Sequence, residues 1–540
     1  MTTRGSDPSR LTVVDEIFLR THRGLGTPIA LQGIWRTGDR VEAALLEDLH
    51  GRLRGGPLGR RVVRARVPAA RRSWRPTVRA HPLDRHDVIA ASGVLDWADT
   101  LGADLDPEYA PGWRLSSAPL DDGGTVIALT CSHVLADARG LIIAVDAALT
   151  AAARSGASSR PQAITGHESP GVAFSTAHNP PTASGNIRTF MPTAVPQSDW
   201  SDAWEQLVTV LGGTAAALAS RLRRRALRVT TAIAAVRAGA CADSAGAARV
   251  AGPPPSPEAD GTTDPARPGG HSGPGAPRPV AATGRGHPRA AWVRRPDHGR
   301  IGEKSAAPFD VGANQRATVD DPRSTRMPTV GAVLCFAAAD WHRAAATSAG
   351  TANSLFVWFV ANMLWASGFP APEVDAALPV DTRDEPRVDN DLSMTAITIT
   401  PADSPGVIRA KARAAYERRM TSPAGLPEET LQLVPDRLAY AMSRGAGERD
   451  ILCSNIGALP PTLHSFGPHE CTAIAARAIH PDLTLARRPR TRLSGYLSRS
   501  GDTYTLALVG LAPELIPNSA ALQLLAEDVA RPLGLPMRNW

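Results

Sequence analysis

A Pro- and Gly-rich segment in the middle of the chain limits which folds the sequence can form. From 251 to 300, 11 residues are Pro and 9 are Gly, so 20 of these 50 positions disfavour helices and strands. The wider stretch 238–327 has no apolar periodicity, which is typical of a linker or a disordered insert. Out-of-frame translation of GC-rich DNA would give the same mixture of residues, and both interpretations stay open. In either case, we place no function there.

The stretches on both sides of this segment have the pattern of α/β structure. Apolar residues recur at helical spacing in 11–18, with Thr12 as the expected N-cap, and again in 41–54. Residues 125–131 predict a buried strand, and the apolar run 140–153 predicts a long helix. The second half repeats this alternation, with strands predicted over 330–337, 374–380, 392–400, 451–454 and 504–510 and helices over 351–367, 408–419 and 520–530.

These patterns divide the chain into four parts. Residues 1–155 form an N-terminal α/β subdomain, and 328–540 form a C-terminal one of similar size. Residues 156–237 contain crossover loops and a helix with several arginines near 221–228, and 238–327 are the linker. A basic amphipathic helix can lie on an anionic membrane, although an ordinary exposed charged face gives the same pattern.

Composition excludes several classes of protein. The net charge of +7 is spread over scattered arginines in 540 residues and aromatic residues make up only 5%, so no nucleic-acid partner is expected. No apolar run approaches the roughly 20 residues of a membrane span, and the N-terminus lacks a secretory signal. A cytoplasmic protein is therefore expected, with peripheral membrane contact left open. A zinc site or disulfides are not expected because no CxxC pair occurs among the cysteines, which are Cys131, Cys241, Cys335, Cys453 and Cys471.

The most informative residues follow the predicted strand 125–131. His133 stands where the chain leaves this strand, Asp137 comes four residues later, and Gly140 opens the next helix. Imidazole has a pKa of about 6.5, so a neutral His133 can take a proton from an alcohol or an amine at physiological pH. A His and an Asp at this spacing also occur by chance, so the spacing alone does not establish catalysis.

Cys131 offers a second kind of chemistry. It lies two residues before His133 and would face the same side of a strand. A Cys–His pair would give covalent acyl transfer. Side chains at i and i+2 of one strand rarely bring sulfur and nitrogen into line, so buried packing is the preferred interpretation.

The segment SHVLADARGL (132–141) resembles the HHxxxDG motif of the condensation-domain or chloramphenicol-acetyltransferase-like superfamily. That superfamily includes nonribosomal peptide condensation domains, bacterial wax ester synthase/diacylglycerol acyltransferases and polyketide-associated acyltransferases. Four further segments resemble the wax ester synthase/diacylglycerol acyltransferases in the same order: LTVVDEIFLR (11–20), TANSLFVWFVANML (351–364), ALPVDTRDEPRVDNDLSMTAITI (377–399) and CSNIGALP (453–460). The resemblance covers about 1–155 and 328–540.

This resemblance implies an α/β fold of two chloramphenicol-acetyltransferase-like subdomains that face each other across a central tunnel. His133 takes the position of the family's general base. Asp137 matches a generally structural aspartate that pairs with an arginine of the second half, and Arg383 matches that arginine, although a solvated loop arginine is equally compatible. Tunnel lining or hydrogen bonds to a developing oxyanion would come from three further residues, Gly140, Ser454 and Asn455.

Two residues depart from the family's motif. Ser132 stands in place of the first His, and Ala138 replaces the Gly that directly follows the Asp. If the family needs a positive φ at that position, Ala costs roughly 1 kcal/mol and tilts the loop. The departures leave open a catalytically degenerate member of the fold that only binds its ligands.

The expected function is transfer of an acyl group from a thioester, carried by coenzyme A or a carrier protein, to a hydroxyl or amine acceptor. A lipid-like acceptor and O-acylation are the preferred forms, with His133 as general base. No metal and no tightly bound cofactor are expected. The alternatives are the degenerate binding protein and a membrane-surface or nucleic-acid-binding protein that uses the arginines near 221–228.

Overall fold

The computed structural model of the chain describes residues 9–158, 198–247, 326–417, 428–443 and 448–540. The two halves, 1–223 and 320–540, form one compact unit, and 224–319 form a second. Helix α5 (Asp199–Ala247) includes the arginine-rich part and the first residues of the predicted linker. The rest of that linker, up to 325, and the predicted loops over 159–197 lie outside the described residues.

The first sheet has six strands, in the order β11-β12-β1-β6-β5-β4. All eight residues of the central strand β6 are buried, which explains its continuous apolar run. Strand β12 comes from the second half of the chain, yet it pairs antiparallel with β1, so both halves contribute to this sheet. The strands are β1 (Ala30–Thr37), β4 (Asp84–Arg85), β5 (Trp113–Pro119), β6 (Thr125–Ser132), β11 (Ser465–Phe466) and β12 (His469–Ile479).

The second sheet has seven strands, in the order β15-β7-β14-β13-β10-β8-β9. Strand β10 runs parallel to both of its neighbours, and the other pairs are antiparallel. These strands are β7 (Val330–Ala337), β8 (Val374–Asp381), β9 (Leu392–Ile399), β10 (Ile451–Ala458), β13 (Leu493–Ser500), β14 (Thr503–Gly510) and β15 (Arg538–Asn539). A separate two-stranded sheet joins β2 (Arg60–Val63) and β3 (Ser73–Pro76).

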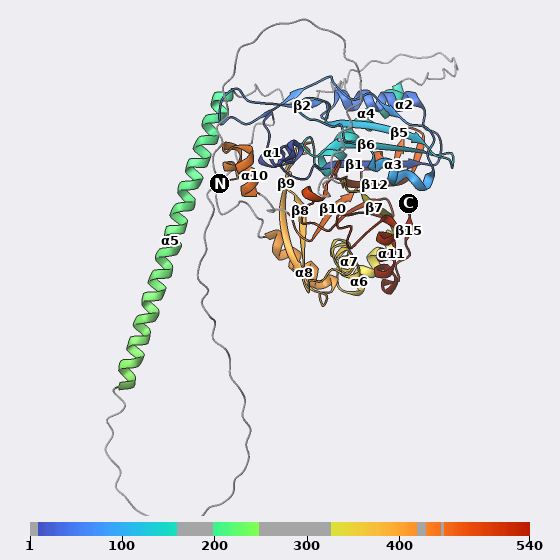
Figure 1. The fold of residues 1–540 in the computed structure, drawn as a ribbon. Helices are drawn as coiled ribbons and strands as arrows, with labels where there is room; N and C mark the ends of the chain where they lie inside the picture. The colour runs from blue at the N-terminus through green and yellow to red at the C-terminus, as the bar shows by residue number, and fades with distance from the viewer. Residues whose placement is uncertain (1–8, 159–197, 248–325, 418–427, 444–447) are drawn as a thin grey trace, which may run out of the picture. The chain divides into compact units, whose positions relative to one another are not determined.

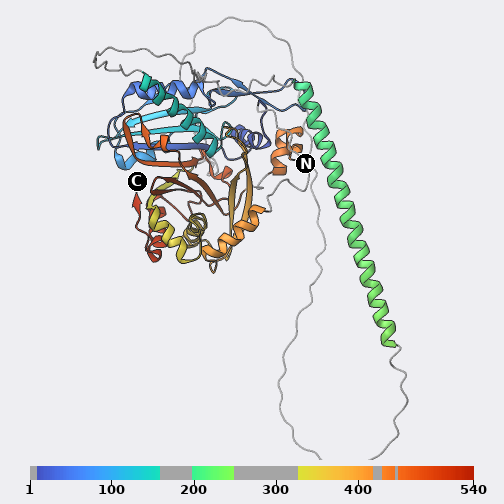
Figure 2. The same ribbon diagram turned by 180° about the vertical axis from the view of Figure 1, so that it is seen from behind.

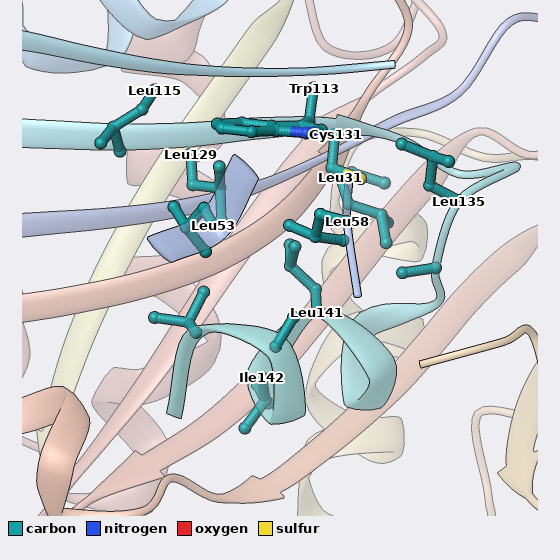
Figure 3. Packing of buried hydrophobic residues seen from close by; sticks show 14 of the residues in the cluster. Leu31, Leu53, Leu58, Trp113, Leu115, Leu129, Cys131, Leu135, Leu141 and Ile142 are labelled. Carbon is teal, nitrogen blue, oxygen red and sulfur yellow. The ribbon is translucent and has the colours of Figure 1, made fainter. Parts of the chain in front are cut away.

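Helices cover one face of the second large sheet and both faces of the first, on which α3 (Val94–Asp99) packs against Ile34, Val126 and Ala128 (Figures 1 and 2). Helices α2 (Ala43–Gly55) and α4 (Ala138–Ser158) pack on the first sheet, and α6 (Ala338–Thr347), α7 (Ala352–Ala366) and α11 (Ser519–Ala530) pack on the second. Figure 3 shows the first of these cores, in which Trp113 and Leu129 of the sheet lie near Leu141 and Ile142 of α4. The remaining α-helices are α1 (Val13–Arg20), α8 (Pro405–Glu417), α9 (Thr430–Leu433) and α10 (Asp436–Ser443).

The predicted α/β fold class, with two subdomains, is confirmed. Helix α1 begins at Thr12, whose Oγ1 accepts a hydrogen bond from the amide of Asp15 (3.1 Å), while the Asp15 carboxylate accepts one from the amide of Thr12 (2.8 Å). The pattern of the sequence does not indicate β12. Four of its eleven residues are alanine, which has a low preference for strands, so its place in the sheet depends on pairing with β1.

Candidate active site

One large cavity, with a volume of about 1000 Å³, is lined by residues of both sheets. Helices α1 and α4 and strands β1, β8, β9, β10, β12 and β13 all contribute to its wall. Much of the wall is apolar, and its larger side chains include Val14, Ile17, Phe18, Ile142, Val145 and Ile474. The cavity is large enough for two organic substrates or one long chain. His133 lies on this wall.

His133 is held where β6 ends. Its amide donates a hydrogen bond to the carbonyl of Ile29 (3.1 Å), and its ring stacks on Phe18 with centroids 3.7 Å apart and an interplanar angle of 17°. Burial lowers the pKa of His133 below its ordinary value, although hydrogen bonds and the negative charge of Asp137 act in the opposite direction. The imidazole is therefore neutral at physiological pH.

Asn390 determines which nitrogen of His133 carries the proton. Nδ2 of Asn390 donates to three acceptors: Oδ1 of Asp15 (2.8 Å) and the carbonyls of His133 (2.8 Å) and Val134 (3.1 Å). These oxygens need a donor, and the amide nitrogen is the donor of Asn390, with its two hydrogens shared among them, so Oδ1 of Asn390 faces Nδ1 of His133 (3.1 Å). Nδ1 therefore donates its proton to Asn390, and Nε2 keeps a lone pair. No described residue hydrogen-bonds to Nε2.

A buried carboxyl group stands behind Asn390. Asp15 is fully buried on α1, and its two oxygens accept from Nδ2 of Asn390 and from the amide of Thr12. Burial, with a smaller effect of the negative charge of Asp389, raises the pKa of Asp15 to about 7. Asp15 thus fixes the orientation of the Asn390 amide, and Asn390 in turn orients His133.

The structure brings Asp137 and Arg383 together. Nη2 of Arg383 donates to Oδ1 of Asp137 (2.7 Å), and the same carboxylate accepts from the amides of Gly140 (2.8 Å) and Asp391 (3.1 Å). Asp137 therefore begins helix α4 and joins it to the segment that precedes β9. Both charged groups are almost completely buried. The ion pair and the hydrogen bonds offset the free energy that is needed to remove these charges from water. These contacts make Asp137 a positioning residue that holds the His133 loop.

Gly140 lies away from the cavity wall. Its amide is already bonded to Asp137, and a Cβ at this position would lie 2.3 Å from the carbonyl oxygen of Val388. Gly140 is therefore needed for the close approach of α4 to the Val388 backbone, and its amide is not available to an oxyanion. Among the described cavity-lining residues, Gly140 does not appear.

The two departures from the family motif have little effect on the cavity. Ala138 is the first residue of α4 and is not among the described non-glycine residues with positive φ, so the strain expected for it is not present. Ser132 is buried at the end of β6, and its amide donates to the carbonyl of Gly112 (2.8 Å). Its side chain is absent from the described cavity lining.

Ser454 and Asn455 of β10 both line the cavity, on the side of the second sheet. Nδ2 of Asn455 donates to Oδ1 of Asn353 (3.0 Å), whereas no described residue hydrogen-bonds to the hydroxyl of Ser454. Ser393, in β9, also lines the cavity, and its buried Oγ has no hydrogen-bond partner among the described residues. The two hydroxyls are thus free to bind a polar atom in the cavity.

Cys131 packs in the core of the first sheet. Its side chain is fully buried among Leu31, Trp113 and Leu135 (Figure 3). Burial raises the pKa of the Cys131 thiol to about 12, so the reactive thiolate is not populated at neutral pH. The structure places Cys131 in this packing role.

Four residues of this site have no role that the sequence patterns predict: Asp15, Asn390, Ser393 and His480. Asn390 lies within a segment that resembles the family, and Asp15 lies in the first one, but neither segment shows what the side chain contacts. His480 follows strand β12 as His133 follows β6, and a histidine at a strand end was a usable signal. It was missed because β12 itself was not predicted.

The other predicted surfaces are only partly described. Arg221 and Arg223 of α5 are exposed, and the side chains of residues 224–229 lie outside the described residues. Within the described ranges, no helix is both long and apolar enough to span a membrane. No group of three or more His, Cys, Asp or Glu side chains suited to a metal ion occurs in that same part of the chain.

Comparisons with known proteins show likeness at the level of structure alone. No family model matches the sequence, and neither does any curated protein sequence. The wax ester synthase/diacylglycerol acyltransferase from Marinobacter aquaeolei VT8 is 13% identical, with a TM-score of 0.45, over 97% of this chain and 100% of that one. Polyketide synthase associated protein 5 from Mycobacterium tuberculosis is 12% identical, with a TM-score of 0.46, over 98% and 99%.

The first condensation domain of the CDA synthetase is 13% identical to this chain, with a TM-score of 0.47, and 97% of each chain is covered. All three similarities concern the fold. The functional conclusion therefore depends on the residues of the site.

Proposed function

We propose that this chain transfers an acyl group from a thioester, carried by coenzyme A or a carrier protein, to a hydroxyl or amine acceptor, with His133 as general base. The single observation that supports this most is the state of the His133 ring. Its Nδ1–H is committed to Asn390, and its Nε2 lone pair has no partner among the described residues of the cavity wall. A neutral, oriented imidazole in a large cavity is suited to proton transfer.

The reaction then has a simple balance of atoms. Nε2 of His133 accepts the proton of the acceptor's O–H or N–H group as the oxygen or nitrogen attacks the thioester carbonyl carbon. The carbonyl becomes a tetrahedral oxyanion. When this intermediate collapses, the C–S bond breaks, and the leaving sulfur takes the proton back from Nε2. The products are an ester or amide and a free thiol, and His133 is again neutral.

Two hydroxyl groups are candidates for stabilising the oxyanion. Ser393 of β9 and Ser454 of β10 lie on strands that β8 separates, and both line the cavity with hydroxyls that no described residue engages. The Ser393 hydroxyl is already buried and unpartnered among the described residues, so it loses little solvation when it donates to a developing negative charge. This role replaces the one predicted for Gly140.

The cavity wall favours apolar substrates. Phe18, Ile142 and Ile474 face the cavity from three different elements, and the volume of about 1000 Å³ accommodates long hydrocarbon chains. Burial of each CH₂ group contributes about 0.8 kcal/mol to binding. A lipid-like acceptor, O-acylated at a hydroxyl, is therefore the preferred form of the proposal. Coenzyme A or a carrier protein enters as co-substrate, and no bound prosthetic group is required for this route.

Thiol release from a panel of acyl-coenzyme A donors of increasing chain length, with long-chain alcohols and amines as acceptors, tests the proposal. Wild-type protein should release thiol in proportion to ester or amide formed, and His133→Ala should reduce the rate by about 10²- to 10⁴-fold. His342→Phe, an exposed position on α6, is the control. Transfer that survives His133→Ala unchanged would refute the general-base role. Binding of donors without turnover would indicate the degenerate protein instead.

A further inference from the structure

A second histidine lies on the wall of the same cavity. His480 directly follows β12, and its Nδ1 lies 3.1 Å from the carbonyl oxygen of Pro28. A carbonyl oxygen only accepts hydrogen bonds, so Nδ1 of His480 donates and Nε2 keeps the lone pair. No described residue hydrogen-bonds to this Nε2. The cavity therefore contains two imidazoles, and each has an unengaged acceptor nitrogen.

The sheet places the two histidines on either side of β1. Ala30, the first residue of β1, is opposite Ser132 of β6 on one side and opposite Ile479 of β12 on the other. Both outer strands run antiparallel to β1, so they end at the same edge, and the next residues are His133 and His480. Adjacent strands lie about 4.8 Å apart, so the two backbones are separated by about 10 Å.

Both histidines line the cavity at that edge, and His480 also borders a small second pocket. The carbonyls of consecutive residues, Pro28 and Ile29, anchor the ring of His480 and the backbone amide of His133 respectively. Burial lowers the pKa of His480 to about 4; the hydrogen bond to Pro28 acts to raise it, and the charge of a protonated His133 is a smaller lowering effect. The rings are thus close enough to interact electrostatically, and His480 stays neutral when the enzyme works near neutral pH.

The proposed transfer requires only one base, so His480 has no part in it. A neutral imidazole whose Nδ1–H is already bonded can only accept a hydrogen bond at Nε2. A partner for that atom has to be a donor, an O–H or N–H group, inside the cavity. Such a polar acceptor atom in a mostly apolar wall selects substrates that can pair with it.

We propose that Nε2 of His480 binds a second O–H or N–H group of the acceptor, so that preferred acceptors carry two such groups a few bonds apart. One group gives its proton to His133 and is acylated, and the other hydrogen-bonds to His480. This inference rests on the proposed acyl transfer. It narrows the acceptor class from simple alcohols and amines to diols, amino alcohols and diamines with an apolar tail.

The test compares acceptors that differ by one hydroxyl. The full chain is assayed for thiol release from one saturating acyl-coenzyme A, with 1-decanol, 1,2-decanediol or 1,3-decanediol as acceptor. Wild type should have a kcat/KM for at least one diol about five- to tenfold above that for 1-decanol, the effect of one neutral hydrogen bond. His480→Phe should bring this ratio close to one, and the ratio is compared between variants because it is independent of any change in overall rate.

Two further variants separate recognition from packing. His480→Gln keeps an acceptor oxygen near the position of Nε2 and should retain part of the preference for diols. It replaces His480→Phe as the test of the inference if that variant does not fold. His342→Phe makes the same substitution at an exposed position on α6 and should keep the wild-type ratio.

Other outcomes overturn the inference. Wild type without a preference for either diol refutes it, as does a ratio that His480→Phe leaves unchanged. Equal losses for all acceptors together with a raised KM for the thioester would show that His480 contacts the donor instead. If wild type releases no thiol with any donor or acceptor, the proposed function itself fails, and this inference fails with it.

Discussion

Asn390→Ala removes the amide that fixes the tautomer of His133 and leaves the rest of the ring's surroundings in place. The variant loses the hydrogen bond between Nδ1 of His133 and Oδ1 of Asn390, which spans 257 positions of sequence. It also loses the three hydrogen bonds from Nδ2 of Asn390, one of which satisfies the buried Asp15. The stack of His133 on Phe18 remains and keeps the ring near its position.

The expected loss of activity follows from these contacts. One neutral hydrogen bond contributes about 1–1.5 kcal/mol, which is roughly tenfold in rate. Loss of the ring's orientation should lower kcat/KM by about another tenfold. This is less than the loss expected for a ring displaced by about 1 Å, because Phe18 still supports the ring. We therefore expect kcat/KM to fall about 100-fold. The unfolding free energy should fall by about 2–4 kcal/mol, because several buried polar groups lose their partner.

The pH dependence gives an independent readout. The hydrogen bond from His133 to Asn390 acts to raise the pKa of His133, so its removal lowers that pKa further. The base form then persists to lower pH, and the acid limb of kcat/KM should shift towards lower pH in the variant. A variant that has only lost packing would keep the wild-type profile at reduced amplitude.

The assay is thiol release from an acyl-coenzyme A as a function of pH, with thermal denaturation measured in parallel. Asn362→Ala is the matched control, since Nδ2 of Asn362 bonds only to the carbonyl of Trp358 within α7 (2.8 Å). The reasoning is refuted if folded Asn390→Ala retains kcat/KM within about threefold of wild type at every pH. Asn390→Ser takes its place if the alanine variant is too unstable to purify.

Three further predictions concern the loop after His133, the core of the first sheet and a buried histidine at the start of β12. Gly140→Ala should lower the unfolding free energy by about 1–3 kcal/mol in urea denaturation, because the new methyl group meets backbone; an unchanged midpoint would contradict the close approach. Cys131→Ala should keep kcat/KM for thiol release within about threefold, whereas a nucleophilic cysteine would lose it entirely. Burial lowers the pKa of His469, but hydrogen bonds to Asp39 (2.9 Å) and Glu42 (2.5 Å) outweigh burial and raise it. The stabilisation is complete below about pH 6.5 and is lost as pH rises through the raised folded pKa, so His469→Gln should lower Tm near pH 6 and leave it almost unchanged near pH 9.

The local structure around the motif follows from sequence patterns alone. The apolar run of β6 is continuous because both faces of that strand are buried, and this pattern needs no partner to be recognised. Thr12 and Asp15 form a capping box within four residues, which depends only on local hydrogen bonds. The histidine at the end of β6 and the helix after it follow from the same local pattern. The resemblance to a known motif added the expected pairing of Asp137 with Arg383.

The chemistry of the site depends on contacts between segments that are distant in sequence. Asp15, His133 and Asn390 are far apart in sequence, and their hydrogen bonds form only when both halves of the chain pack together. The same holds for His480, because β12 reaches the first sheet by pairing with β1 across more than 400 residues. No local pattern records these contacts, since an amide or an imidazole in a loop satisfies its neighbours in many ways. Burial selects the hydrogen-bond partners, because a buried polar atom can bond only to the groups that the fold places next to it.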